Sequence, residues 1–182
     1  MPIPINWDAN AAVSACPLIA WEASAWRIHK QKYVATDPGG SRRVSGRYHR
    51  GTDQYPSTQT WAALYLATQP EICLAELFRH ITPELFPFLN DYRLSEIALG
   101  LTAVADCRCA ETLQAPLAAL MDDFDYELTQ RIGKAAFERG FEGLLVPSAT
   151  ALGDNLILFP LNIRPPSRME IISSRDPRLR PV

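Results

Sequence analysis

The pattern of apolar and polar positions along this chain predicts more strands than helices. Short apolar or alternating segments with the character of strands cover residues 25–29, 62–67, 93–98, 101–105, 143–147, 155–159 and 168–172. The segments 93–98 and 101–105 are predicted to be two strands joined around Gly100. These strands do not alternate regularly with helices. The pattern therefore favours an α+β fold, with mixed and mostly antiparallel sheets and flanking helices, over a doubly wound fold.

A first helix is predicted directly after the segment 62–67. Thr68 is a candidate cap, Pro70 falls in the first turn, and Glu71 lies near the positive end of the helix dipole. The apolar positions recur at i, i+3, i+4 and i+7 and predict one core-facing stripe, made of Leu74, Leu77, Phe78 and Ile81. Glu76 lies off this stripe, so we expect its side chain at a cleft on the helix margin.

A second helix is predicted over residues 122–139, with Gly140 as its C-terminal stop. Its apolar side is formed by Phe124, Leu128, Ile132 and Ala135. Residues 36–60 are polar and rich in turn-forming residues, which predicts a long loop. A loop of this length inside a compact domain is usually functional or mobile.

Composition adds limits to this picture. The chain has 182 residues and a mass of 20.3 kDa, which predicts one domain over residues 1–182 with a core of its own. Its 18 Lys and Arg against 20 Asp and Glu give a formal net charge of -2. There is no overall basic field to hold a polyanion, so we expect no direct binding of nucleic acid.

The remaining sequence features argue against a metalloprotein, a disulfide-bonded protein, a secreted protein and a membrane protein. The four cysteines form no CxxC pair, and the three histidines lack a spacing typical of joint metal ligation, so we expect reduced thiols and no metal. The start lacks the basic region and apolar run of a secretory signal, and no uninterrupted apolar stretch is long enough to span a bilayer. We therefore expect a cytoplasmic protein that does not enter a membrane.

Four polar residues stand where their neighbours are apolar or turn-forming: Arg47, Tyr65, Glu76 and Ser148. The guanidinium of Arg47 is a planar fork of donors that suits a phosphate or pyrophosphate. Tyr65 offers a flat face for a heterocycle, and Glu76, surrounded in sequence by apolar residues, is costly to bury without donors. Ser148 ends a strand, from which a hydroxyl can enter a cleft. Together they outline a site for a charged nucleotide.

Each of these residues also has a structural interpretation. Arg47 would make a surface ion pair, Tyr65 would be a core tyrosine, and Ser148 would belong to a turn. Glu76 would be a solvated helix position paired with Arg79 or His80. No GxSxG elbow surrounds Ser148, and no glycine-rich phosphate loop is present.

The ordered set Arg47, Tyr65, Glu76 and Ser148 resembles the RES domain family, which is named for its Arg, Glu and Ser. The matching stretches are residues 46–48, 64–76, 146–149 and 153–159, with Trp26 and Arg27 in a strand near the start. The resemblance covers residues 25–160, which leaves N-terminal and C-terminal extensions. The chain departs from the family pattern at His49, where Asn is frequent, and in an insertion over residues 50–61.

This resemblance implies a fold similar to ADP-ribosyltransferases and diphtheria-like toxins, with NAD as substrate and no cofactor. It implies that Arg47 holds an NAD phosphate, that Tyr65 stacks near the nicotinamide and that Glu76 acts at the ribose. Ser148 would help to position the ligand, so that Glu76, Arg47 and Ser148 form the catalytic set. Tyr48 and Arg27 are further substrate-binding candidates.

The sequence therefore leads to one main functional hypothesis and three alternatives. The main hypothesis is a toxin of a toxin–antitoxin system that cleaves the nicotinamide glycosidic bond of NAD and depletes the cellular pool. Its partner would be a cognate antitoxin with a helix-turn-helix DNA-binding domain, through which oligomers could form. The alternatives are an ADP-ribosyltransferase that modifies a cellular protein, a non-catalytic module that binds a nucleotide or peptide, and four unrelated structural residues.

Overall fold

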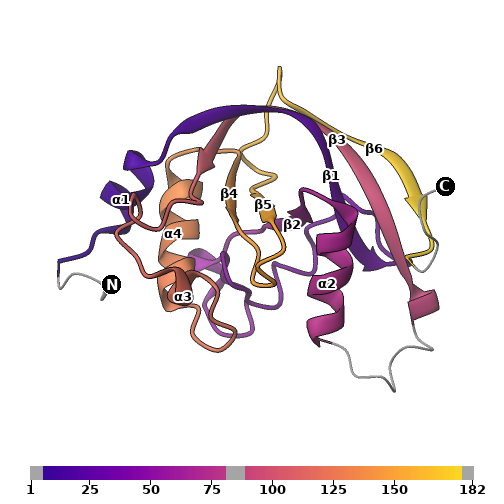
Figure 1. Ribbon diagram of the computed structural model, residues 1–182, viewed down its shortest axis with the longest axis horizontal. Helices are drawn as coiled ribbons and strands as arrows, with labels where there is room; N and C mark the ends of the chain where they lie inside the picture. Colours follow the sequence, from indigo (N-terminus) through magenta and orange to yellow (C-terminus); the bar gives the residue numbers. More distant parts are fainter. Residues whose placement is uncertain (1–5, 81–88, 178–182) are drawn as a thin grey trace.

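The structure is a computed structural model that describes residues 6–80 and 89–177 of the chain. Two long antiparallel strands form its frame: β1 (Leu18–Lys30) and β3 (Tyr92–Asp106) pair along almost their whole lengths. In Figure 1 this curved ribbon arches over the rest of the molecule. The frame thus spans both ends of the domain.

Four further strands complete one sheet with β1 and β3. Their bounds are β2 (Leu64–Ala67), β4 (Gly143–Pro147), β5 (Asp154–Leu158) and β6 (Arg168–Arg175). The strand order is β1-β2-β5-β4-β3-β6, and β1 also pairs with β3, so that five strands form a closed circuit with β6 as an added edge. Among the described residues, β3 and β4 are the one parallel pair of strands, and the other pairings are antiparallel. The predicted α+β class with a mixed, mostly antiparallel sheet is confirmed.

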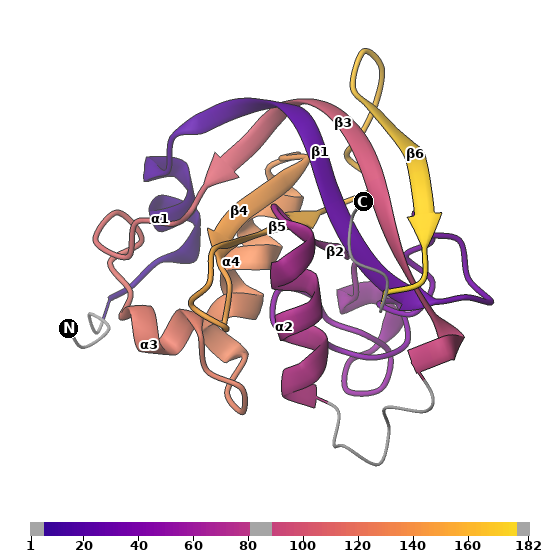
Figure 2. The same cartoon turned by 45° about the vertical axis from the view of Figure 1, so that its right-hand side comes forward.

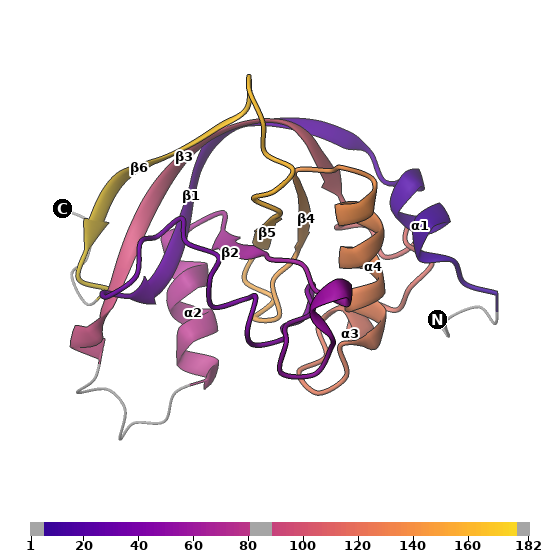
Figure 3. The same ribbon diagram turned by 180° about the vertical axis from the view of Figure 1, so that it is seen from behind.

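Helices lie beneath the two ends of the arch. The helices α1 (Ala9–Ala15), α3 (Leu117–Leu120) and α4 (Glu127–Glu138) gather under one end, and α2 (Pro70–His80) lies under the other (Figure 1). A short 3-10 helix, Ser57–Gln59, interrupts the long loop that precedes β2. Figure 3 shows from behind that this loop passes below β2, between α2 and α4. Within the described residues, no helix is both long enough and apolar enough to cross a membrane.

The core has a main part and two smaller parts. The largest cluster packs α4 and α1 against β4, with Ile132, Leu144 and Phe159 fully buried at its centre. A second cluster fills the space between the arch and the β2–β5–β4 strands, and a small third one lies where α2 meets β1. Burial is thus deepest at the α4 end, whereas α2 covers only a small apolar area.

Several predicted strands match the structure. The segment 143–147 is β4 with the same bounds, and 155–159 differs by one residue at each end. The prediction of two strands joined around Gly100 is wrong, because β3 continues straight through this glycine. A Cβ at Gly100 would lie 2.9 Å from the guanidinium carbon of Arg168 and 3.0 Å from a carboxylate oxygen of Glu22. The glycine therefore leaves room for side chains of the neighbouring strands and does not end the strand.

The core-facing stripe predicted for α2 is also wrong. Ile72 and Cys73 are the buried residues of this helix, whereas Phe78 is 46% exposed, and Ile81 lies outside the described residues. Ile72 and Cys73, near the start of the helix, pack with Ala67 of β2 and Leu94 of β3, and the Cys73 thiol donates to the Trp26 carbonyl on β1. Thr68 does not cap the helix, because α2 begins at Pro70 and Thr68 lies one residue before the cap position; its hydroxyl donates to the carbonyl of Asp154 on β5. The remaining faces of α2 are left for the rim of a cleft.

The second predicted helix begins later than its apolar pattern indicates. α4 starts at Glu127, because the Asp122 carboxylate accepts bonds from the backbone amides of Phe124 and Asp125 and forms a turn there. Phe124 is 98% exposed and does not belong to the helix. At the other end, Gly140 has the positive φ of 78° that the predicted C-terminal stop requires.

Candidate active site

A cleft of about 370 Å³ opens between α2, the loop before β2 and the ends of β4 and β5. Arg47, Tyr65 and Glu76 all line it, although they come from a loop, a strand and a helix. Ser148 follows β4 and is fully buried behind Glu76. The four residues that the sequence singled out therefore converge on one site.

The carboxylate of Glu76 is fixed by two donors from the sheet. Its Oε1 accepts a hydrogen bond of 2.5 Å from the Ser148 hydroxyl and one of 2.9 Å from the Asn155 side-chain amide. Asn155 lies on β5 and lines the cleft. The other oxygen, Oε2, lies 3.9 Å from Nη1 of Arg79, one turn further along α2. One oxygen is therefore held in place, while the second is not fixed by these two donors.

The bonding of Ser148 shows what this hydroxyl can do. It donates its one proton to Glu76, so the contact of 2.7 Å with Thr150 Oγ1 must be donated by the threonine. The Thr150 amide donates a further bond of 3.1 Å to the same oxygen. With one proton given and two bonds accepted, the Ser148 oxygen is saturated. Its geometry is that of a residue that orients a carboxylate and not that of a nucleophile.

Tyr65 is held by a second network, which involves His49. The His49 Nε2 lies 2.8 Å from the Val44 carbonyl, which can only accept, so Nε2 carries the proton and Nδ1 is an acceptor. The Tyr65 hydroxyl therefore donates to Nδ1 over 2.8 Å and accepts from the Tyr48 amide over 2.8 Å. Burial raises the pKa of Tyr65 and lowers the pKa of His49, so both groups are neutral near pH 7.

This network explains the local sequence around Arg47. Gly46 and His49 form an isolated β-bridge that turns the chain around Arg47. A Cβ at Gly46 would lie 2.5 Å from Cε1 of His49 and 3.1 Å from the Tyr65 hydroxyl. The His49 bond to Tyr65 thus ties the loop that carries Arg47 to strand β2.

The guanidinium of Arg47 has protein partners on both of its terminal nitrogens. Nη1 donates to the Leu120 carbonyl over 3.0 Å, and Nη2 donates to Oδ1 of Asp123 over 2.9 Å. The Tyr126 ring lies under the group, 5.4 Å from ring centre to guanidinium carbon. These contacts come from the segment between α3 and α4, far from Arg47 in the sequence.

Two other candidates lie differently from the four central residues. The Arg27 guanidinium donates to the carbonyls of Ala35 and Asp37, and Arg27 is not among the residues that line the cleft. Its geometry is that of a support for the loop after β1. Tyr48 borders the cleft, but only 2% of it is exposed, and its ring packs in the main core. Its contacts to the site therefore run through its backbone.

Sequence reasoning did not assign a role to Asn155, Asp123 or Tyr126. Asn155 falls within the stretch 153–159 that resembles the RES pattern, and the available signal was an amide side chain directly before a run of apolar residues. Asp123 and Tyr126 lie in a segment expected to be helical, so nothing in the sequence predicted that they would meet Arg47.

Comparison with known proteins identifies the class. The family model described as the RES domain matches residues 24–180, so the chain belongs to the RES domain family. The fold is similar to a chain in the crystal structure of the Mycobacterium tuberculosis MbcT–MbcA toxin–antitoxin complex, with a TM-score of 0.76. The two are 24% identical, and the match covers 92% of this chain and 91% of that chain. No curated protein matches this sequence.

Proposed function

We propose that this protein is the toxin of a toxin–antitoxin system and that it cleaves the bond between nicotinamide and ribose in NAD. Membership of the RES domain family and the likeness to a chain of a toxin–antitoxin complex support the first part. The observation that carries the second part is the Glu76 carboxylate, which is held by Ser148 and Asn155 at the wall of the cleft.

The chemistry of NAD fits a fixed carboxylate. When the glycosidic bond breaks, its electron pair goes to the ring nitrogen and nicotinamide leaves as a neutral molecule. The ribose carbon becomes oxocarbenium-like and positive, and a nucleophile then adds to it and loses a proton. A carboxylate already oriented by two hydrogen bonds stabilises the charge that develops, because it need not reorganise during the reaction.

The other lining residues suit the remaining parts of the substrate. The Tyr65 ring borders the cleft, and its hydroxyl is already fully used, so it offers a rigid flat face for the nicotinamide. The cleft volume lies at the low end of the range for small-molecule sites. It is therefore sized for the nicotinamide and ribose, with the phosphates toward Arg47 at its edge.

Nicotinamide release by the purified protein tests this proposal. We expect Glu76→Gln to lower the rate at least about 100-fold, because the amide keeps the shape of the side chain and removes its charge. Glu71→Gln, an exposed position on the same helix, is the matched control and should retain the rate. Equal rates for the parent and Glu76→Gln would contradict the proposal. Labelled ADP-ribose on a protein in a lysate would instead indicate a transferase.

The proposal also includes the partner and location of the protein. The antitoxin would be a separate chain with a helix-turn-helix domain, and the likeness to a chain of a toxin–antitoxin complex supports such a partner. Oligomers would form through that partner, and the activity would act on NAD in the cytoplasm. Co-expression with the antitoxin should restore both growth and the cellular NAD level, whereas restored growth without restored NAD would indicate another target.

A further inference from the structure

The Asp123 carboxylate bridges two arginines beside the cleft. Its Oδ1 accepts from Arg47 over 2.9 Å, and its Oδ2 accepts from Nη2 of Arg79. The three side chains come from the loop before β2, the segment between α3 and α4, and helix α2. Figure 2 shows α2 and the α3–α4 segment at the same lower side of the molecule. One anion is thus held between two guanidiniums.

Asp123 is the acidic residue of its segment that reaches across to the arginines. Asp122 accepts from two backbone amides of the turn, and Asp125 accepts from the Glu127 amide at the start of α4. These two carboxylates therefore hold the turn that presents Asp123. The segment between α3 and α4 therefore holds the Asp123 carboxylate in position between Arg47 and Arg79.

We propose that Arg47 and Arg79 form a two-arginine subsite for the pyrophosphate of the substrate and that Asp123 occupies this subsite in the free protein. The identity of the anion rests on the proposed function. Two oxygens of one carboxylate, each bound to a different guanidinium, define the geometry that two phosphate oxygens would take. The pyrophosphate displaces Asp123 and brings the ribose toward Glu76, whose Oε2 lies 3.9 Å from Arg79.

The exposure of the three side chains and the charge of the ligand determine whether a pyrophosphate can displace Asp123. The side chains of Arg79 and Asp123 are 29% and 33% exposed, and Arg47 is 15% exposed. Ion pairs this close to solvent favour the bound form by no more than about fivefold. A pyrophosphate carries more charge than one carboxylate, so it competes well for the same two guanidiniums. Asp123 therefore acts as a weak competitor that lowers the affinity for anions.

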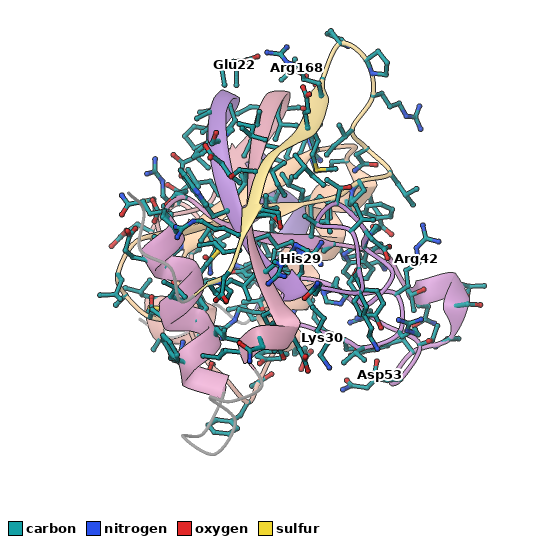
Figure 4. All side chains as sticks on the ribbon, turned by 90° about the vertical axis from the view of Figure 1, so that its right-hand side faces the viewer. Glu22, His29, Lys30, Arg42, Asp53 and Arg168 are labelled. Atoms are coloured by element: carbon teal, nitrogen blue, oxygen red, sulfur yellow. The ribbon has the colours of Figure 1, made fainter. Side chains whose placement is uncertain are left out.

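Binding of inorganic pyrophosphate and of ADP-ribose, measured by calorimetry, tests this subsite without catalysis. We expect Asp123→Asn to tighten both by about two- to fivefold and Arg79→Gln to weaken both by about tenfold. The control is Arg168→Gln, which removes an exposed arginine paired with Glu22 at the far end of the β1–β3–β6 strands (Figure 4). Its affinity for both anions should equal that of the parent.

Each outcome decides between the alternatives. Unchanged or weaker binding in Asp123→Asn would overturn the role of Asp123, and parent-like binding in Arg79→Gln would overturn the two-arginine subsite. Asp123→Ser provides the same comparison with a smaller side chain, and thermal unfolding checks that each variant is folded. A protein that binds both anions as expected but releases no nicotinamide would refute the proposed function and leave the subsite standing.

Discussion

The two ends of the cleft are built from different kinds of structure. At one end, Glu76 lies on a helix and receives its bonds from the end of β4 and from β5, and Ser148 is fully buried. At the other end, Arg47 lies on a loop and meets a second loop through side chains that are partly exposed. Reaction at a defined carbon needs a rigid group, whereas a phosphate is held by charge and tolerates adjustment. On the proposed function, we therefore expect the Glu76 end to set the rate and the Arg47 end to set the affinity.

The largest effect in this comparison is expected from Ser148→Ala. This change removes a short charge-assisted bond to Glu76, worth about 1.5–3 kcal/mol, so nicotinamide release should fall about ten- to 100-fold with little change in KM. Steady-state kinetics measures both constants. Thr150→Val is the matched control, since Thr150 contacts Ser148 but not Glu76. A rise in KM with an unchanged kcat would show instead that the rigid end sets affinity, and it would contradict this division of roles.

A smaller effect on stability is expected from Tyr65→Phe. The ring stays, but the Tyr48 amide and the His49 Nδ1 both lose their partner in a buried place. Unsatisfied buried groups cost about 1–3 kcal/mol, which urea unfolding can resolve. Tyr33→Phe, at an exposed tyrosine, should leave the free energy of unfolding unchanged. Parent stability in Tyr65→Phe would mean that the Arg47 loop does not depend on this tether.

The smallest effect is expected from pH acting on His49. Burial lowers its pKa in the folded protein, so on acidification the unfolded chain takes up a proton first, near the ordinary histidine value of about 6.5. Its contribution to stability is therefore present above that pH and is lost as the pH falls toward the folded pKa. His49→Asn should reduce the fall in unfolding free energy between about pH 7 and pH 5.

A second histidine serves as the comparison for this measurement. His29 lies on β1 (Figure 4), is bonded to Ser95, and also has a pKa lowered by burial. His29→Gln should reduce the pH dependence too, but without any change in pyrophosphate binding, because His29 has no contact with the Arg47 loop among the bonds of the described residues. An identical pH dependence in His49→Asn and the parent would show that the lowered pKa of His49 does not contribute to the pH dependence of stability.

The sequence predicted a strand accurately where both faces of that strand are buried, as in β4. Residues 143–147 form a continuous apolar run, and β4 follows it residue for residue. The prediction failed at Gly100, because a glycine within an apolar segment is typical of a break between strands. In the structure, this glycine instead leaves space for the side chains of Arg168 and Glu22 on the neighbouring strands. The buried face of α2 was also predicted wrongly. Apolar periodicity does not reveal that a helix lies at the rim of a cleft and covers little of the core.

The site residues likewise fall into those that local sequence indicated and those that only long-range contacts defined. Local sequence marked Arg47, Tyr65, Glu76 and Ser148, because a polar group among apolar or turn-forming neighbours carries a cost that structure or function must offset. The roles of Asn155 and Asp123 depended on contacts between residues 79 and 76 positions apart in the chain. No local pattern specifies such a contact.

The sequence by itself determined the class of fold, the family and the four residues around which the cleft is built. Tertiary structure alone decided that Ser148 orients Glu76, that His49 tethers Tyr65, and that Asp123 joins two arginines. The physical reason is that periodicity and composition report burial and turn preference, which are properties of neighbouring residues. The direction of a hydrogen bond depends on where the whole chain brings its donor and acceptor together.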